Sequence, residues 1–238
     1  MLQVLSAILG LLLAYLIPGL SISYAIFPYE RRLPLLGRIA LSVSLSSSLI
    51  TSSLFLSNWL LGCFENSFII GLQAILILAS WMICRRQRTN RVSSTRNFPK
   101  AVDDERALPK PVLWLFSSAT VFIILFRFYN ALLFPITNWD SLTEYAYLGR
   151  LYFTEGRMPT ISGATLGIGS SANYPPLVSL LYAWFYTMTG GVNEVLAKTV
   201  SPIFSLLTVI ITHSLAKEMY NSRTLAISSL FFLATVPI

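Results

Sequence analysis

The sequence predicts an all-α protein, a polytopic bundle of about seven transmembrane helices with an external loop that contains an interfacial helix. Three observations predict this class. The chain of 238 residues is 55% hydrophobic and only 11% charged, with a mean hydropathy of +0.67. Several apolar runs reach the roughly 20 residues that cross a bilayer. Eight of its 17 basic residues lie between Arg85 and Lys110, so the net charge of +7 indicates membrane topology rather than a nucleic-acid partner.

Seven apolar segments are expected to form helices. They run over Leu2 to Phe27, Leu36 to Leu61, Phe68 to Cys84, Val112 to Phe134, Pro176 to Thr189, Val195 to Leu215 and Leu225 to Ile238. The first is expected to stay in the protein, because it lacks the basic start and the clear cleavage site of a signal peptide. The second carries seven serines between Ser42 and Ser53. Such small hydroxylated residues let membrane helices pack closely and form hydrogen bonds between helices.

The distribution of basic residues predicts three parts and an orientation. Loops rich in Lys and Arg tend to stay in the cytoplasm. Residues 85–111 are therefore expected to be a basic cytoplasmic linker. This linker separates an N-terminal three-helix membrane part, residues 1–84, from a second membrane part, residues 112–238. The same orientation places the N-terminus and the loop 135–175 on the external side of a cell membrane that the chain crosses several times.

The short apolar segment 176–189 leaves two possibilities open. It has only 14 residues, so it is either a short crossing helix or a re-entrant or interfacial segment. A crossing would put Lys217 and Arg223 outside, against the bias for basic residues.

The chain carries no sequence signature of a metal or redox site. Cys63 and Cys84 flank one expected helix and would lie about 30 Å apart at 1.5 Å per residue, too far to form a disulfide with each other. His213 is the single histidine, and no Cys-x-x-Cys or His-Glu-x-x-His pattern occurs. The sequence therefore indicates neither a cofactor nor a divalent cation.

The long loop 135–175 contains a pattern typical of a helix that lies along a membrane surface. At 100° per residue, polar side chains gather on one side and mostly apolar, ring-rich side chains on the other. The polar side comprises Asp140, Thr143, Glu144, Tyr147, Arg150, Thr154 and Glu155, and the other side Leu142, Tyr145, Ala146, Tyr152 and Phe153, with Leu148 and Leu151 as exceptions. Two acids beside a membrane indicate chemistry in a chain with few charges. Asp140 also suits the N-cap of this helix.

Several motifs in the second half occur together in a defined order. Trp139-Asp140 opens the loop, a Leu-Gly-Arg-Leu-Tyr-Phe-Thr-Glu-Gly-Arg-Met-Pro stretch begins at Leu148, and Tyr174-Pro175-Pro176-Leu177 opens a short helix. A loop with the basic residue Lys198 and a charged turn at residues 216–223 follow. In this order the motifs resemble the lipid-dependent glycosyltransferases of the GT-C superfamily, in particular the protein mannosyltransferase and aminoarabinose transferase group.

This resemblance implies an enzyme that moves a sugar from a polyprenyl-phosphate donor to an acceptor glycan, lipid or protein at the external membrane face. Members of the group carry more helices and usually an external domain, so residues 1–238 are expected to be an N-terminal portion. The arrangement of the group also favours a short crossing helix for residues 176–189. Many members have two adjacent acids at the loop start and His or Lys before the Pro-Pro pair. Here Ser141 follows Asp140, and Tyr174 precedes the prolines. Separately, residues 1–84 resemble the N-terminal helices of uncharacterised, mainly archaeal, membrane proteins.

Sugar transfer from a lipid phosphate needs a base for the acceptor proton and cations for the departing phosphate. Asp140 is expected to be the general base, because a partly dehydrated carboxylate is more basic than one in water. Glu144 is expected to orient the acceptor. The candidates for binding the substrate or its phosphate are Arg127, Arg150, Arg157, Tyr174 and Lys198. Contact with lipid headgroups is an equal alternative for the basic residues, and Tyr174, Trp184 and Tyr186 also suit interface aromatics.

The alternative function is a non-enzymatic transporter or assembly subunit for cell-surface polysaccharide. In that case Asp140 and Glu144 stabilise a loop or bind a cation. Membrane lipids are partners under both hypotheses, and nucleic acid under neither.

Overall fold

The computed structural model describes residues 2–27, 35–89, 108–134, 136, 145–159, 176–220 and 222–236. Within these ranges every regular element is a helix, which confirms the predicted all-α class. Five of these helical stretches are long and apolar enough to cross a membrane: Gln3–Ile26, Leu35–Leu61, Asn66–Gln87, Lys110–Leu133 and Glu194–Tyr220. The protein is therefore a polytopic bundle of apolar helices.

The described helices follow one another along the chain in the predicted order. They are α1 (Leu2–Tyr15), α2 (Ile17–Ile26), α3 (Leu35–Leu61), α4 (Asn66–Thr89), α5 (Lys110–Leu133), α6 (Tyr147–Glu155), α7 (Leu177–Thr189), α8 (Glu194–Lys198), α9 (Val200–Tyr220) and α10 (Arg223–Thr235). Two differences are that the first predicted helix is divided into α1 and α2 and that the short helix α8 is added. The spans α8–α9 and α1–α2 each count as one membrane-length stretch.

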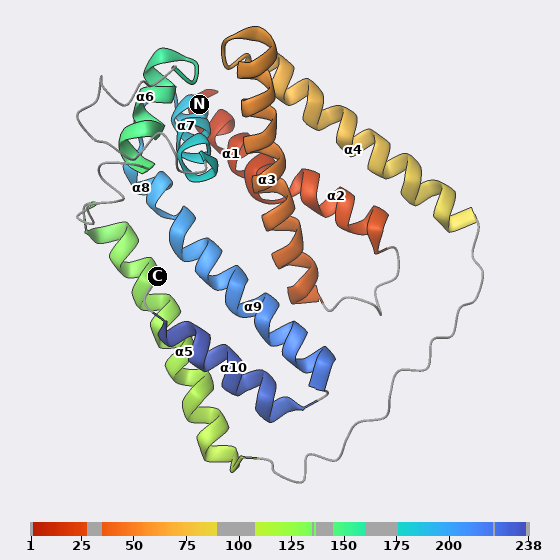
Figure 1. Ribbon diagram of the computed structural model, residues 1–238, viewed down its shortest axis with the longest axis vertical. Coiled ribbons are helices and arrows are strands. Elements are labelled where there is room, and N and C mark those ends of the chain that lie inside the picture. Colours follow the sequence, from red (N-terminus) through yellow and green to blue (C-terminus); the bar gives the residue numbers. More distant parts are fainter. Residues whose placement is uncertain are drawn as a thin grey trace.

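The long helices run roughly side by side, from upper left to lower right in Figure 1, so that their ends gather on two opposite faces. One face, here named the α6–α8 end, carries α6, α7 and α8 together with the start of α1, the α3–α4 turn and the end of α5. The opposite face, here named the basic end, carries the ends of α2, α4 and α9 and the starts of α3, α5 and α10.

The first predicted helix is broken into two near Leu16, where the backbone leaves the helical conformation between α1 and α2. The reason for a close approach of α2 to α3 is Gly19. A Cβ at this position would lie 1.9 Å from the carbonyl oxygen of Ser42, and the Gly19 N–H donates a 2.8 Å hydrogen bond to Ser46 Oγ. A residue without a side chain therefore lets the two backbones meet.

The serine-rich helix α3 packs on several sides, as its composition predicted. Ser42, Ser46, Ser47, Ser53 and Ser57 are all buried. Ser47 donates to the carbonyl oxygen of Ala14 in α1, 3.0 Å away, and Ser53 accepts a 2.6 Å hydrogen bond from Gln73 in α4. These bonds link α3 to helices on two sides, the role that small hydroxylated residues play between membrane helices.

The start of α3 also carries a buried cation. Arg38 donates to the carbonyl oxygens of Ser23 and Phe27 at the end of α2, and its guanidinium lies 4.2 Å from the centre of the Tyr24 ring. A cation beside the last carbonyls of a helix complements the helix dipole. Arg38 therefore fixes the end of α2 against α3.

The short helix α7 lies at the centre of the main hydrophobic core. Nine of its 13 residues are buried, among them Trp184, Phe185 and Tyr186 with no exposed surface. It packs against α1, α3 and α6. The largely apolar sequence of α7 suits this burial.

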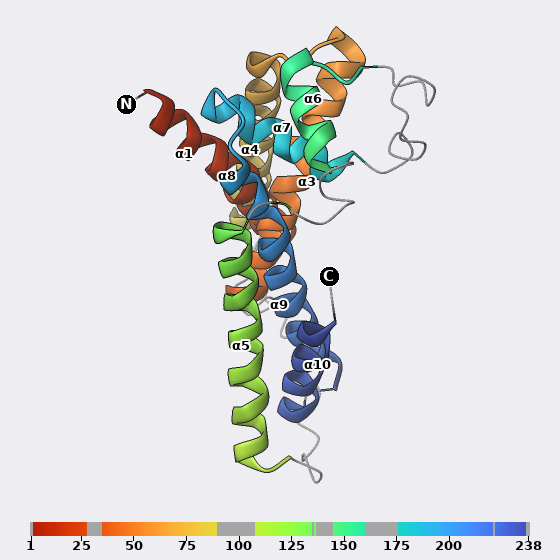
Figure 2. The ribbon, with the colours of Figure 1, turned by 90° about the vertical axis from the view of Figure 1, so that its left-hand side faces the viewer.

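The structure describes how α7, which covers most of residues 176–189, lies relative to the long helices. In Figure 2, α7 lies across the α6–α8 end of the bundle instead of running along the long helices. The chain thus enters and leaves α7 on the same face, and α9 then runs to the basic end. The ends of α9 and α10 that carry Lys217 and Arg223 consequently share a face with the last turn of α4.

Candidate functional site

Three of the predicted site residues lie outside the described residues. Asp140, Glu144 and Tyr174 belong to the ranges 137–144 and 160–175, so their roles stay predictions. The helices that precede and follow these ranges are described. They are α5, α6 and α7, and they meet at the α6–α8 end.

Helix α6 has the two faces that the sequence predicted. Tyr147, Arg150, Thr154 and Glu155 are exposed, whereas Ala146 and Tyr152 are buried. Leu148, an exception to the predicted pattern, is buried as well. The pattern suggested a helix that lies along a membrane surface, but the ring-rich face packs against the core around α7. Burial raises the pKa of the Tyr152 phenol above its ordinary value.

The contact between α6 and α7 depends on Gly149. A Cβ at this position would lie 2.7 Å from Tyr182 Cβ and 3.2 Å from the Ser179 carbonyl oxygen. The second atom is backbone and the first is the stiff base of a buried side chain. Glycine is therefore required for α6 to lie this close to α7.

Arg150 is held by a partner that the sequence did not suggest. Its guanidinium forms an ion pair with Glu194, the first residue of α8, and it interacts electrostatically with the Tyr186 hydroxyl. Glu194 follows the N-cap residue Asn193, whose side chain accepts a 3.0 Å hydrogen bond from the Leu196 N–H. An acid in the first turn of a helix is favoured by the dipole, and Arg150 ties this short helix to α6.

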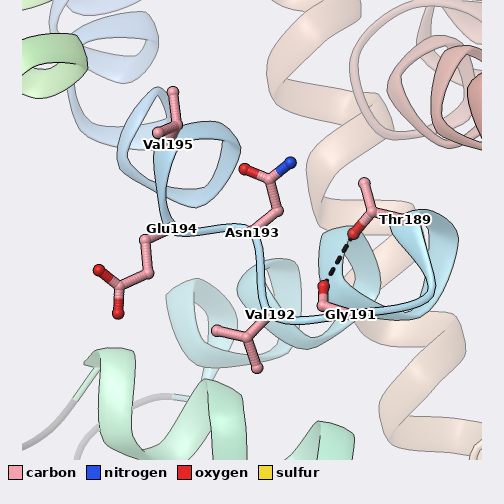
Figure 3. Close-up of a pocket in the computed structure, with 6 residues that line it drawn as sticks. All are labelled: Thr189, Gly191, Val192, Asn193, Glu194 and Val195. Atoms are coloured by element: carbon pink, nitrogen blue, oxygen red, sulfur yellow. Dashed lines mark hydrogen bonds between the residues drawn. The ribbon is translucent and has the colours of Figure 1, made fainter.

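Figure 3 shows a shallow depression of about 440 Å³ on the turn between α7 and α8. Its lining residues are Thr189, Gly191, Val192, Asn193, Glu194 and Val195. The turn closes on itself, because Thr189 Oγ1 donates to the Gly191 carbonyl oxygen over 2.9 Å. The Glu194 carboxylate is directed away from this turn and toward α6. The polar groups around this depression do not point to a common centre, as they do in a typical ligand pocket.

Lys198 and Arg127 are engaged by backbone carbonyls. Lys198 Nζ donates over 2.7 Å to the carbonyl oxygen of Phe134, the C-cap residue of α5. Arg127 in α5 donates to Ser205 Oγ in α9 and to the carbonyl oxygens of Ala234 (2.9 Å) and Val236 (2.7 Å). Both cations thus complement the end of a helix, where the dipole is negative. For Arg127 this role differs from both predicted roles, which were binding of the substrate and contact with lipid headgroups.

Arg157 is the most open of the predicted cations in the described ranges. Its side chain is 58% exposed, against 49% for Arg150, and the nearest carboxylate oxygen of a described residue, on Glu155, is 3.7 Å away. Such an exposed pair is weak. The residues on both sides of Arg157 are hydrogen-bonded to the α3–α4 region: the Met158 N–H donates to Asn58 Oδ1, and the Gly156 carbonyl accepts from the Phe64 N–H.

The aromatic residues of α7 were predicted wrongly. Trp184 and Tyr186 suited interface aromatics in the sequence, but both are fully buried. The Trp184 indole N–H donates a 3.0 Å hydrogen bond to the carbonyl oxygen of Gly10 in α1. A buried tryptophan normally finds such a partner.

Cys63 and Cys84 are both free. Among the residues that the structure describes, no group of three or more His, Cys, Asp or Glu side chains could hold a metal ion.

The fold defines a polytopic α-helical membrane protein in which three short helices cover one end of the bundle. No protein-family model matches the chain, and no curated protein or solved structure matches it. Its function therefore has to be argued from its own residues.

Proposed function

We propose that the chain is a membrane glycosyltransferase of the GT-C type, or the N-terminal part of one. It moves a sugar from a polyprenyl-phosphate donor to an acceptor hydroxyl or amine at the external face of the membrane. The observation that carries the proposal is the layer of short helices α6, α7 and α8, inserted between the spans α5 and α9 at one end of the bundle. In the sequence, Trp139-Asp140 stands between α5 and α6.

The proposed sidedness rests on the charges at the two ends. Among described residues, the helix turns at the basic end carry seven basic residues and one acid: Arg38, Arg85, Arg86, Arg88, Lys110, Lys217, Arg223 and Glu218. The described part of the α6–α8 end carries three of each sign: Arg150, Arg157, Lys198, Glu65, Glu155 and Glu194. Because basic loops stay in the cytoplasm, the α6–α8 end faces outward.

The chemistry assigned to this end divides among few residues. Asp140 is the general base that removes the acceptor proton as the acceptor attacks the anomeric carbon, and Glu144 orients the acceptor. Arg157 binds the departing lipid phosphate, since an arginine fork fits phosphate oxygens. Lys198 and Arg150 hold the layer together through Phe134 and Glu194. Buried α7 gives the layer a rigid base, the support that positioned groups need.

The first test is transfer by the purified protein in lipid nanodiscs. A panel of radiolabelled polyprenyl-phosphate sugars is supplied with short-chain glycan, lipid and peptide acceptors, with and without a chelator of divalent cations. We expect time-dependent loss of label from one donor and release of polyprenyl phosphate. Intact donors in every combination would contradict the proposal. Movement of a lipid-linked glycan across a vesicle membrane without cleavage would favour the polysaccharide transporter or assembly subunit.

A further inference from the structure

Two hydrogen bonds tie the turn after α6 to the N-terminal part of the chain. The Met158 N–H donates to the side-chain oxygen Oδ1 of Asn58 in α3 over 2.7 Å. The Phe64 N–H, in the α3–α4 turn, donates to the Gly156 carbonyl oxygen, also over 2.7 Å. The Phe64 ring packs edge-on against Tyr152 in α6, with ring centres 6.5 Å apart. These contacts hold the end of α6 and the turn after it against residues about a hundred positions earlier in the chain.

Arg157 lies between the two bonded residues. Gly156 ends α6 in the left-handed conformation, with φ +64°, which turns the chain sharply before Arg157. With the neighbours of Arg157 anchored on both sides, its backbone has little freedom, while its side chain stays largely exposed. A charged group presented from a fixed backbone loses less entropy on binding a ligand than one on a loose loop.

We propose that Asn58 is a positioning residue for phosphate binding: it holds the turn that presents Arg157 to the phosphate of a polyprenyl-phosphate substrate. This rests on the proposed function, and it gives the N-terminal helices a part in the site. We choose Arg157 because two other predicted phosphate ligands already have partners in the protein. Arg150 pairs with Glu194, and Lys198 donates to a helix C-terminus. The only described competitor for Arg157 is the weak contact with Glu155.

The kinetic test compares Asn58→Ala with Arg157→Gln and with the double variant. Loss of one hydrogen bond to the turn is expected to raise KM for the donor about fivefold, with kcat changed less than twofold. In the Arg157→Gln background, Asn58→Ala is expected to add nothing to KM, because Asn58 acts through Arg157. Additive effects, or a fall in kcat at constant KM, would show that Asn58 only stabilises the fold. Asn66→Ala, at an exposed asparagine beginning α4, is the matched control and is expected to behave as wild type.

A second measurement does not depend on sugar transfer. Hydrogen–deuterium exchange at the Met158 amide is expected to be protected in wild type and in Asn58→Asp, which keeps the acceptor oxygen, and to be at least tenfold faster in Asn58→Ala. Binding of a polyprenyl monophosphate in nanodiscs is expected to weaken about fivefold in Asn58→Ala. Unchanged exchange or unchanged binding would overturn the role of Asn58. If wild type binds this phosphate but transfers no sugar, the proposed function fails while the positioning role stands.

Discussion

The indole N–H of Trp184 donates a 3.0 Å hydrogen bond to the carbonyl oxygen of Gly10, which is 174 positions earlier in the chain. Gly10 permits this approach, because a Cβ there would lie 2.5 Å from Met188 Cγ. Helix α7 is consequently held between α1 on one side and α6 on the other. The N-terminal part and the second membrane part, although separated by the basic segment 85–111, share one core.

Replacement of Trp184 tests this shared core. Trp184→Phe removes the hydrogen bond to Gly10 and leaves unfilled volume in a fully buried position. We expect a loss of about 2 kcal/mol in the free energy of unfolding, measured by denaturant titration in detergent. Trp114→Phe, at a residue in α5 that is 74% exposed, is the control and should cost less than about 0.5 kcal/mol. Equal effects of the two substitutions would mean that α1 does not support α7.

The close contact of α6 with α7 predicts opposite signs for two glycine substitutions. Gly149→Ala places a methyl group against Tyr182 and the Ser179 backbone, so it should destabilise the protein by about 1–3 kcal/mol. Gly71→Ala in α4 meets no atom within 4 Å and should stabilise by up to about 1 kcal/mol, because alanine favours helix. Thermal unfolding of both variants in the same detergent gives the comparison. A Gly149→Ala variant as stable as Gly71→Ala would contradict the described packing.

The hydrogen bonds of Arg127 predict that it anchors α10. Arg127→Met leaves Ser205 and the last carbonyls of α10 without this cation, so the α5–α9–α10 contact should weaken by about 1–3 kcal/mol. Faster hydrogen exchange in residues 223–235 is the expected signal, with residues 35–61 unchanged. Arg127→Lys should recover part of the protection. Unchanged exchange combined with lost donor binding would instead indicate that Arg127 binds the substrate.

The two cysteines are native reporters of sidedness. Cys63 is exposed beside the start of α4, at the α6–α8 end, and Cys84 is half-buried near the end of α4, at the basic end. A membrane-impermeant maleimide applied to intact cells should modify Cys63 and leave Cys84 unmodified. The variants Cys63→Ser and Cys84→Ser identify which residue reacts. Modification of Cys84 before permeabilisation would reverse the proposed orientation.

The sequence predicted those features that depend on local pattern. Hydrophobic run length gave the all-α membrane class, and periodicity gave the two faces of α6, with Arg150 on the exposed side and Tyr152 on the other. The serines of α3 correctly indicated close packing. Each of these properties is set by residues near one another in the chain, where helical geometry fixes which side chains share a face.

The sequence did not predict features that depend on distant partners. The short apolar run of α7 reads the same whether it crosses a membrane or lies buried in protein, so its placement across the bundle required its neighbours. The partners of Lys198 and Arg127 are carbonyl oxygens 64 and 107 to 109 positions away, which no side-chain motif marks. Asn193-Glu194 did carry a signal that was missed, since an Asn N-cap followed by an acid is typical of a helix start.

The most direct test of the central claim is sugar transfer by Asp140→Asn in the full-length protein, measured beside wild type with the donor that wild type uses. Removing a general base should lower kcat about 100-fold or more while donor binding stays within about twofold of wild type. Glu144→Gln, which keeps Asp140, should retain more activity. Transfer by Asp140→Asn at the wild-type rate would contradict the assignment of Asp140 as the base.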